Sequence, residues 1–300
     1  MTLSIVIVNW NTRERVLTCL GSIYSAQLVR KFEVWVVDNA SSDGSVEAIG
    51  SIFPEASLIR NTRNVGFAKA CNQAIRASQG QYLFLLNSDA MLRRGSVDEM
   101  IEFMRANENV GALGPQLLND DGSAQSSCAR FPTVMSEALH LAGLGQKLVN
   151  DRKLNSQRKQ GPRPVDWVSG AALLLRRDAI SQVGLFDEDF FLYSEETELC
   201  WRLWQKGWEV WFLPSTTVYH LGGGSSALRP VENYEQLYLS KIHFFAKAYG
   251  QHAANKLRLV IRVGAFMKLI VWGIVIAARF PLDRESSAFK RFRREMALLR

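Results

Sequence analysis

The sequence has few cysteines, and no two of them are close together. Cys19, Cys71, Cys128 and Cys200 lie more than fifty residues apart and form no C-x-x-C motif. Neither a zinc cluster nor a disulfide framework is indicated, so a reducing compartment fits the chain. The first residues also lack a basic region followed by a small-residue cleavage site, and secretion is therefore not expected.

A glycine-rich phosphate motif is missing after the first apolar stretch. Asn9-Trp10-Asn11 stands where a G-x-G-x-x-G motif would begin, which counts against a dinucleotide-binding dehydrogenase. What the chain has in quantity is apolar residues, which make up 47% of its 300 positions. This is enough for one large core or two small ones, and it excludes a wholly disordered chain.

Basic charge is concentrated toward the C-terminal end. The formal net charge is +7, but residues 247–300 hold twelve of the 36 Lys and Arg and only three of the 29 Asp and Glu. The remaining residues therefore carry 24 basic against 26 acidic side chains. Because most of the chain is nearly neutral, we expect no nucleic-acid partner and assign the basic character to the tail.

Strands and helices alternate in the N-terminal part. Apolar, β-branched runs predict strands, and the segments between them predict helices. The predicted strands are residues 4–8, 32–37, 57–60 and 82–87, and the predicted helices are residues 14–24, 46–52 and 66–77. This alternation is typical of an α/β fold with a parallel, doubly wound sheet.

The stretch Tyr82 to Asp89, Y-L-F-L-L-N-S-D, is the segment on which the predicted site depends. Its continuous apolar run suits a strand buried on both faces, so its polar end must emerge at the rim of the sheet. Asn9 and Asp38 end two other predicted strands, and the three polar ends should converge where nucleotides bind. There Asp89 could hold a hard cation on phosphate oxygens. The alternative is that Asn87-Ser88-Asp89 only caps a following helix.

The pattern is weaker in the middle of the chain. A helix ending at Arg105, a strand over Val110–Leu118 and a turn at 119–122 are predicted, and periodicity then fades. Lys147–Pro164 is polar and basic and reads as a mobile loop, either a lid over a substrate or an ordinary surface loop. Further strands are predicted at residues 171–175, 208–213 and 216–220.

Three carboxylates cluster at the start of a predicted helix. Glu195, Glu196 and Glu198 follow the aromatic run Phe190–Tyr193 in a helix that runs to Gly207. Acids at a helix start are favoured by the helix dipole, which is the structural explanation. Burial beside an apolar run would instead raise a carboxyl pKa toward that of a working base, which is the interpretation that we favour.

Four motifs in order resemble those of glycosyltransferase family 2, and its rhamnosyltransferase-like members in particular. The resemblance covers residues 3–245 and rests on Asp38-Asn39-x-Ser41-x-Asp43-Gly44-Ser45, Asn64-x-Gly66-Phe67-x-x-Ala70-x-Asn72, Leu86-Asn87-Ser88-Asp89 and Glu195-Glu196-x-Glu198-Leu199-Cys200-x-Arg202. It implies a GT-A fold, which is an α/β fold with a doubly wound mixed sheet, together with a nucleotide-sugar donor, a divalent cation and inversion at the anomeric carbon. Residues 1–245 would form this domain.

The resemblance also implies roles for residues of the nucleotide side. Val8 and Trp10 are similar to the positions that hold the nucleobase, and Asp38 to the residue that bonds its ring nitrogen or the ribose. Asn64 and Gly66 resemble the segment that lies along the nucleotide.

The remaining roles concern the metal, the base and the acceptor. Asn87-Ser88-Asp89 resembles a D-x-D motif with one carboxylate fewer, so Asp89 and His220 would bind Mg²⁺ or Mn²⁺. Glu196 occupies the position of the catalytic base, although relatives often have Glu-Asp where this chain has Glu-Glu. The sugar and acceptor side would be formed by Trp167, Gly170, Asp187 and Glu195, although an aromatic ring is as often part of the core as a platform.

The tail is expected to bind membrane. Leu259–Phe280 is apolar apart from Arg262, Lys268 and Arg279, and Lys290 to Arg294 add a basic flank. At about 1.5 Å per residue, the part with uncharged ends, Val263–Ala278, is about 24 Å long, which is shorter than the roughly 30 Å hydrocarbon core, and Lys268 lies inside it. We therefore expect residues 246–300 to form a basic helical extension on the membrane surface, with a true span or a buried helix as alternatives.

The sequence thus predicts an inverting, metal-dependent glycosyltransferase at the inner face of the cell membrane. Its expected donor is dTDP-rhamnose or a UDP-sugar, and its expected acceptor is a cell-envelope polysaccharide or a polyprenyl-linked glycan. One alternative is a nucleotide-sugar binding or scaffold protein that is catalytically inactive, which the D-x-D motif with one carboxylate fewer suggests. Another is a nucleotidyltransferase, which the missing glycine-rich basic signature disfavours.

Overall fold

The computed structural model describes residues 2–143, 161–222, 230–277, 295–296 and 298. The chain divides into two compact units, one of Met1–Phe131 with Asp151–Ala227 and one of Pro132–Asn150 with Leu228–Arg300. The first unit contains the central sheet, and the second contains the helices α5 (Val134–Leu141), α10 (Pro230–Tyr249) and α11 (Gln251–Ala277). The helix α10 runs across residue 245.

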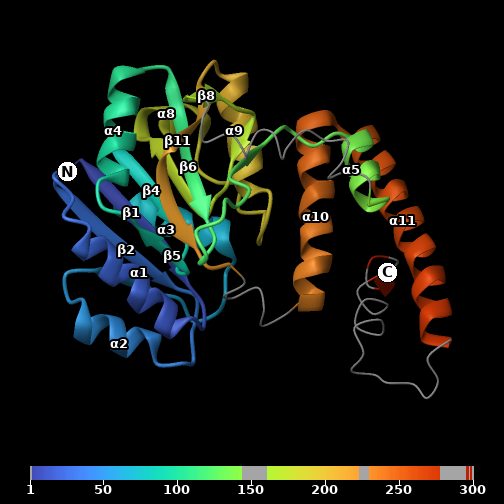
Figure 1. The fold of residues 1–300 in the computed structure, drawn as a ribbon, viewed down its shortest axis with the longest axis horizontal. Helices are drawn as coiled ribbons and strands as arrows, with labels where there is room; N and C mark the ends of the chain where they lie inside the picture. Colours follow the sequence, from blue (N-terminus) through green and yellow to red (C-terminus); the bar gives the residue numbers. More distant parts are fainter. Residues whose placement is uncertain (1, 144–160, 223–229, 278–294, 297, 299–300) are drawn as a thin grey trace. The chain divides into compact units, whose positions relative to one another are not determined.

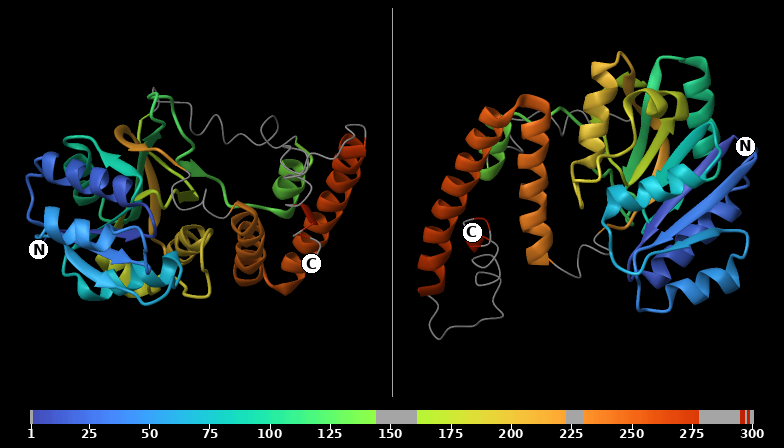
Figure 2. Two further views of the ribbon diagram at one scale, coloured as in Figure 1. Left: turned by 90° about the horizontal axis from the view of Figure 1, so that it is seen from below. Right: turned by 180° about the vertical axis from the view of Figure 1, so that it is seen from behind.

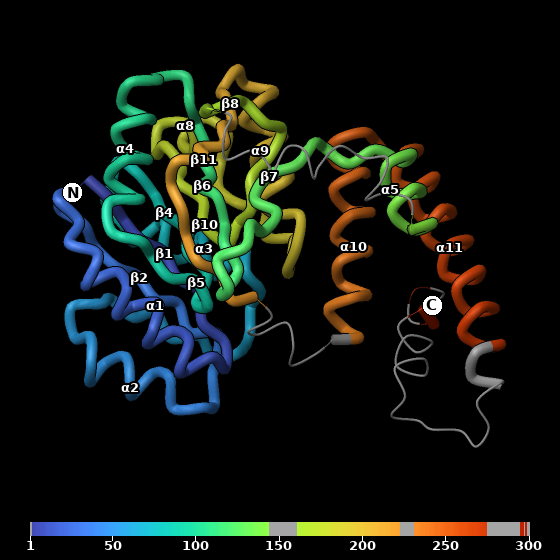
Figure 3. Tube along the Cα trace, in the orientation of Figure 1, coloured from blue at the N-terminus to red at the C-terminus, as the bar shows by residue number. Residues whose placement is uncertain are grey.

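The first unit is built on a nine-stranded mixed sheet (Figure 1). Its strand order is β3-β2-β1-β4-β10-β6-β11-β5, with β8 added beside β11. The bounds are β1 (Leu3–Asn9), β2 (Phe32–Asp38), β3 (Ser57–Arg60), β4 (Tyr82–Leu86), β5 (Ala90–Leu92), β6 (Val110–Leu118), β8 (Arg163–Pro164), β10 (Ala172–Arg176) and β11 (Glu209–His220). A separate pair joins β7 (Cys128–Ala129) to β9 (Trp167–Val168), and Figure 3 labels β7 and β10.

Strand directions bring the polar strand ends to one edge. β1, β2, β3 and β4 are parallel, and β10 is antiparallel to both β4 and β6. Because β11 is parallel to β6, its end at His220 lies on the same edge as the ends of β1, β2 and β4. β10 begins on this edge, where Ala172 pairs with Leu86. The α/β fold with a mixed doubly wound sheet is thus confirmed.

Helices cover both faces of the sheet (Figure 2). One core cluster joins residues of α1 (Arg13–Ser25), α2 (Ser45–Ile52) and α4 (Ser96–Ala106) to one face. Within β4, Tyr82, Phe84 and Leu86 belong to this cluster, whereas Leu83 and Leu85 are fully buried outside it. Since successive strand residues point to opposite faces, β4 is buried on both, as predicted. The helices α3 (Phe67–Ala77), α8 (Arg177–Val183) and α9 (Glu195–Gln205) belong to the unit as well.

Several local predictions need correction. Residues 90–92 after Asp89 form the strand β5, so Asn87-Ser88-Asp89 does not cap a helix, and α4 begins only at Ser96. The two strands expected at residues 208–213 and 216–220 are one strand, β11, whose register shifts between Leu213 and Thr217. The end of the predicted loop, Arg163–Pro164, pairs with β11, while residues 147–160 lie outside the described part of the chain.

The second unit is helical. Its elements are α5 (Val134–Leu141), α10 and α11 (Gln251–Ala277), so the predicted C-terminal helix begins eight residues earlier than Leu259. Thr133 caps α5 by accepting from the backbone N–H of Ser136. Lys241 of α10 donates to the buried carboxylate of Glu137 at 2.7 Å. Gly264 of α11 leaves room for Leu141, whose Cβ would lie 3.4 Å from a methyl group at that position.

Two glycine positions allow a matched test of core packing in the first unit. A Cβ added at Gly114 of β6 would lie 2.6 Å from the Cβ of Val168, whereas one added at Gly21 of α1 meets nothing within 4 Å. We expect Gly114→Ala to lower the free energy of unfolding by about 1–3 kcal/mol through overpacking. Gly21→Ala should raise it by about 0.5–1 kcal/mol because alanine favours the helix. Urea denaturation of both variants checks the opposite signs.

Candidate active site

The predicted nucleotide-binding residues are joined by hydrogen bonds at the carboxyl edge of the sheet. The Asn9 amide donates to Asp38 Oδ1 at 2.8 Å and to Ser41 Oγ at 3.1 Å. Asp38 Oδ2 accepts from the backbone N–H of Ser41 at 2.9 Å. The side chain of Asp38 is therefore held in place although it is almost fully buried. Val8 and Trp10, on either side of Asn9, are half-buried.

Thr12 connects this group to the end of β4. Its hydroxyl donates to Asn9 Oδ1 at 2.7 Å and lies 2.9 Å from Ser88 Oγ. Thr12 immediately precedes α1 and makes no side-chain capping bond to that helix. Sequence reasoning missed this residue, because a threonine before a helix is ordinarily taken for a cap.

Asp89 lies between two basic side chains. Its Oδ1 is 3.3 Å from His220 Nε2, and its Oδ2 is 3.4 Å from the Arg15 guanidinium. Arg15 also donates to the carbonyl of Gly222 at 2.9 Å. Asp89 is 7% exposed. Arg15 places a permanent positive charge beside the buried Asp89 carboxylate. Sequence reasoning did not predict this ion pair.

The atoms around His220 suit a divalent cation. Nε2 lies 3.3 Å from both Asp89 Oδ1 and the Asn87 amide nitrogen, while Nδ1 lies 2.7 Å from Gln125 Oε1. Two adjacent ligands of an octahedral ion with bonds of about 2.1 Å are separated by about 3.0 Å. Asp89 Oδ1 and His220 Nε2 therefore fit Mg²⁺ or Mn²⁺ in chemistry and in spacing.

The segment expected along the nucleotide is bound to the loop before α9. Gly66 has a φ of +87°, and a Cβ there would lie 2.5 Å from the Phe191 carbonyl oxygen. The N–H of Phe67 donates to that oxygen at 2.7 Å, and Gly66 N–H donates to Asn64 Oδ1 at 3.0 Å. Only glycine permits this approach, so Asn64 and Gly66 lie directly beside the loop that leads to the acidic helix.

The three carboxylates at the start of α9 have different surroundings. Glu198 makes two hydrogen bonds to the Arg202 Nε, at 2.7 and 2.9 Å, and a third to its terminal nitrogen at 2.8 Å. Arg202 also donates to the carbonyl of Leu185 at 2.8 Å. Glu198 therefore has a structural role: it holds Arg202, which ties α9 to the preceding loop. Glu195 and Glu196 form no such ion pair with the residues that the structure describes, and each has one buried carboxylate oxygen without a hydrogen-bond partner among them.

Burial raises the pKa of both neighbouring carboxyls. The pKa of Glu195 lies well above its ordinary value because of desolvation and the nearby charge of Glu196. Desolvation also raises the pKa of Glu196, opposed by backbone N–H groups including that of Gly170. Glu196 Oε1 lies 3.5 Å from that N–H, and its carboxyl carbon would be 3.7 Å from a Cβ at Gly170. A raised carboxyl pKa is the property expected of a general base.

Backbone pairing connects the two acidic positions. The N–H of Asn87 donates to the Ala171 carbonyl at 3.0 Å, where β10 meets β4. Asp89 lies two residues after Asn87 on the β4 side of this contact. Gly170, which faces Glu196, immediately precedes Ala171 on the β10 side. The structure accordingly brings Asp89, Gly170 and Glu196 to one edge of the sheet.

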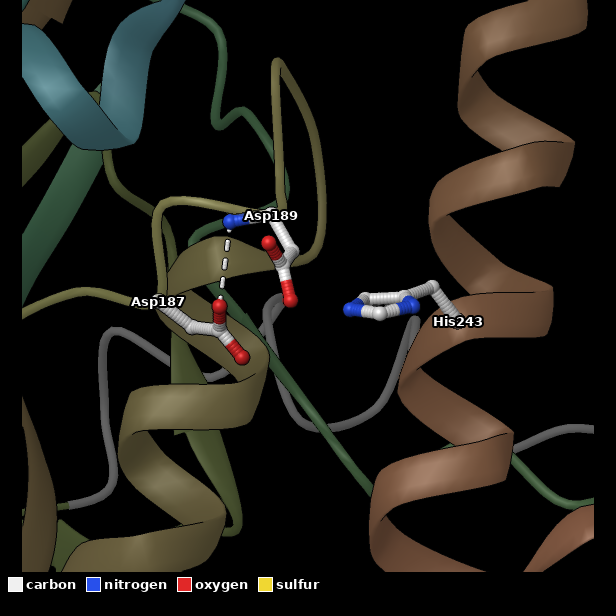
Figure 4. A group of neighbouring side chains, drawn as sticks. All are labelled: Asp187, Asp189 and His243. Atoms are coloured by element: carbon white, nitrogen blue, oxygen red, sulfur yellow. Dashed lines mark hydrogen bonds between the residues drawn. The ribbon is translucent and has the colours of Figure 1, made fainter.

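Trp167 and Asp187, expected on the acceptor side, take part in local structure. The Trp167 indole donates to the Arg130 carbonyl at 3.0 Å. Asp187 Oδ1 accepts from the backbone N–H of Asp189 at 3.0 Å, as the dashed line in Figure 4 shows. His243, also drawn there, belongs to α10 of the second unit. Both Trp167 and Asp187 are half-exposed, so part of each side chain is open to solvent.

The raised pKa of Glu195 predicts a pH-dependent stability. A carboxyl whose pKa is higher in the folded state stabilises folding below its unfolded pKa, and this contribution is lost as pH rises through the folded pKa. Glu195→Gln has no such loss, so its free energy of unfolding should exceed the wild-type value by more at pH 8 than at pH 5. Glu198→Gln is the control, since loss of the Arg202 pair should destabilise it by about 1–3 kcal/mol at neutral pH. Urea denaturation across this pH range checks both, and an unchanged difference for Glu195→Gln would contradict the first.

The sequence is similar to that of known glycosyltransferases. The family described as Glycosyl transferase family 2 matches residues 4–184. An N-acetylglucosaminyl-diphospho-decaprenol L-rhamnosyltransferase of Mycobacterium tuberculosis is 30% identical over 249 residues, which cover 78% of this chain and 80% of that protein. Rhamnosyltransferase WbbL of Escherichia coli is 24% identical over 62% of this chain and 64% of its own length.

Solved structures share the fold at low sequence identity. The mannosyltransferase PcManGT of Pyrobaculum calidifontis, in complex with GDP-Man and Mn²⁺, has a TM-score of 0.58 and 16% identity, covering 99% of this chain and 84% of that one. S. aureus TarS 1-349 in complex with UDP-GlcNAc has a TM-score of 0.53 and 16% identity, covering 89% and 73%. These neighbours are glycosyltransferases, and the GT-A fold expected from the resemblance is confirmed.

Proposed function

The chain belongs to glycosyltransferase family 2, and we propose that it is an inverting enzyme that transfers rhamnose or a related hexose from a nucleoside diphosphate. The mycobacterial relative, by its name, transfers L-rhamnose to N-acetylglucosaminyl-diphospho-decaprenol. That name supports a polyprenyl-linked or polysaccharide acceptor of the cell envelope, and we infer dTDP-rhamnose or a UDP-sugar as the donor. The single observation that carries the proposal is the β4–β10 backbone contact, which brings Gly170, the neighbour of the Glu196 carboxylate, close to the strand end that Asp89 follows.

Glu196 would act as the general base. In an inverting transfer, a carboxylate removes the proton of the acceptor hydroxyl while its oxygen attacks the anomeric carbon opposite the leaving group. The raised pKa of Glu196 makes its carboxylate a stronger base than an exposed one. The Gly170 N–H, 3.5 Å from Oε1, orients the carboxylate.

The opposite side of the scissile bond would lie at Asp89. Asp89 and His220 would hold a divalent cation, which when bound offsets the negative charge that develops on the departing diphosphate. Arg15 is a second positive group at the same carboxylate. Its guanidinium, which is partly exposed, is suited to a phosphate oxygen and partly replaces the carboxylate–cation pair that a full D-x-D motif would provide.

Two isosteric substitutions test which acid is the base. Glu196→Gln keeps the side-chain volume but removes the proton acceptor, so we expect unchanged donor binding and a transfer rate lower by about 10²-fold or more. Glu195→Gln is the matched neighbour and should lose less than tenfold. Asp89→Ala should weaken both donor binding and transfer. The measurements are transfer assays and calorimetry with dTDP-, UDP- and GDP-sugars in Mg²⁺ or Mn²⁺.

If Glu195→Gln lost more of the transfer rate than Glu196→Gln, the base role would move to Glu195. Equal transfer by wild type and Glu196→Gln would remove it from Glu196. A wild-type protein that binds a donor tightly and transfers it to no acceptor would support the alternative of an inactive nucleotide-sugar binding protein.

We further propose that α11 lies on a membrane surface. None of the described helices is both long and apolar enough to span a membrane. One face of α11 is buried in the second unit through Ala254, Leu257, Ile261 and Ala265. The opposite face exposes a continuous apolar set formed by Leu259, Val263, Phe266, Met267, Ile270, Val271 and Ile274.

Charge complementarity selects an anionic bilayer as the occupant of this face. The sequence of α11 holds Lys256, Arg258, Arg262 and Lys268 and no acidic residue. Lys268 pairs with Glu295 at 3.4 Å, so the other three are the cations offered to a bilayer. Such a helix inserts its apolar side chains among acyl chains while its cations meet lipid phosphates. The enzyme would then work peripherally on the cytoplasmic face of the cell membrane, where a polyprenyl-linked acceptor is within reach. The basic residues 290–294 lie outside the described part of the chain.

Vesicle flotation of the full chain tests the α11 face. The double variant Phe266→Ser, Ile270→Ser removes two exposed anchors, each worth about 1.5–3 kcal/mol when fully buried, so vesicle affinity should fall at least tenfold. Met135→Ser, which changes a side chain 69% exposed on α5, is the control and should keep binding. Binding should require phosphatidylglycerol and be absent with phosphatidylcholine alone. Light scattering that shows a wild-type dimer, lost in the double variant, would assign the face to a second copy instead.

A further inference from the structure

A chain of hydrogen bonds runs from the turn after β6 to His220. Asp121 Oδ1 accepts from the Ser123 hydroxyl at 2.6 Å and from the Ser123 backbone N–H at 2.9 Å. The hydrogen bond from this hydroxyl lowers the pKa of Asp121, so its carboxylate is ionised and can only accept. The hydroxyl proton of Ser123 is thus directed at Asp121, and Ser123 Oγ is free to accept from the Asn119 amide at 2.8 Å.

This first bond determines the orientation of the next two amides. Since Asn119 Nδ2 donates to Ser123, its Oδ1 must face Gln125, whose Nε2 donates to it at 3.0 Å. Gln125 Nε2 also lies 3.4 Å from the His220 carbonyl oxygen, a second acceptor. A flipped Gln125 amide would place its oxygen against both acceptors. Gln125 Oε1 therefore faces His220 Nδ1, at 2.7 Å.

A neutral imidazole has one N–H and one lone pair, so the partner of one nitrogen decides the state of the other. Because Gln125 Oε1 can only accept, Nδ1 carries the proton, and in the neutral ring Nε2 presents its lone pair. The Asn87 amide nitrogen lies 3.3 Å from Nε2 and is a suitable donor to that lone pair in the metal-free protein, and a bound cation would take its place. The lone pair then lies 3.3 Å from Asp89 Oδ1, so two ligand atoms face each other.

We propose that Gln125 is a positioning residue, which holds His220 with its proton on Nδ1 and so presents Nε2, together with Asp89, to a divalent cation. The ligand role of the pair rests on the proposed function, whereas the tautomer follows from the hydrogen bonds alone. Outer hydrogen bonds of this kind orient a ligating imidazole, and their loss typically costs 10- to 100-fold in metal affinity. The turn at residues 119–122, which the nucleotide and base assignments left unused, acquires a role through Ser123 and Gln125.

Two substitutions separate this role from a merely structural one. Gln125→Leu keeps the approximate size and removes the acceptor, so the Nδ1 proton is no longer directed. Gln125→Glu loses the hydrogen bonds that Gln125 Nε2 donates to Asn119 and to the His220 carbonyl, but it keeps an acceptor for Nδ1 and should therefore keep the proton on Nδ1. Gln79→Leu, at an exposed position that contacts none of these residues, is the control. Thermal unfolding of each variant monitors folding.

The tautomer is read directly in the metal-free full-length protein. Long-range ¹⁵N–¹H spectra distinguish the two tautomers, and the His220→Gln variant identifies the His220 signals among the four histidines. We expect wild type, Gln125→Glu and Gln79→Leu to show the Nδ1–H form and Gln125→Leu to show a mixture or the Nε2–H form. Mn²⁺ titration by calorimetry should then show affinity lowered 10- to 100-fold in Gln125→Leu and within about threefold of wild type in the other two.

An Nε2–H tautomer in the wild type, or an unchanged tautomer in Gln125→Leu, would overturn the proposal. So would a Mn²⁺ affinity equal in Gln125→Leu and wild type. A wild-type protein that binds no Mn²⁺ but shows the Nδ1–H form lost in Gln125→Leu would uphold the positioning role and count instead against the metal site of the proposed function. Failure of the two proposals is therefore distinguishable.

Discussion

The antiparallel contact between β4 and β10 is the constraint on which the candidate site depends. β4 is buried on both faces and can only end at the sheet edge, which carries its polar residues to that edge. β10 runs the other way and begins there, so the loop before it delivers Gly170 beside the end of β4. Without this reversal the segment that faces Glu196 would start at the opposite edge, and the two acids would not share a region.

The site combines polar groups that are fully satisfied with acids that are not. Asn9, Thr12, Asp38 and Ser88 are nearly buried and bonded to one another, so their orientation costs little to maintain. Glu195 and Glu196 are desolvated and form no ion pair within the described part of the chain, and their raised pKa values reflect the cost of that burial. Buried carboxyls of this kind destabilise the folded state at neutral pH, and they are characteristic of sites where a protein uses a reactive acid.

In the second unit, α11 has one buried face and one exposed apolar face. α11 packs one face through small and aliphatic residues, among them Ala254 and Ala265, and leaves larger apolar side chains such as Phe266 on the other. A helix that is apolar all round is ordinarily buried all round. α11 itself has no acidic residue, and of its four cations Lys268 pairs with Glu295, which leaves three to favour a surface of opposite charge over a polar solvent or a second cationic copy.

The sequence by itself determined the strand–helix alternation, the buried character of β4, the polar strand ends and the acidic start of α9, because each depends on the periodicity or composition of neighbouring residues. Only the tertiary structure decided which partner each acid has. Glu198 and Glu196 are equivalent in the sequence, yet one pairs with Arg202 and the other faces Gly170. Thr12, Arg15 and Gln125 acquire their roles through partners 76, 74 and 95 residues away. Hydrogen bonds over such separations depend on strand order and register, which local sequence patterns do not encode.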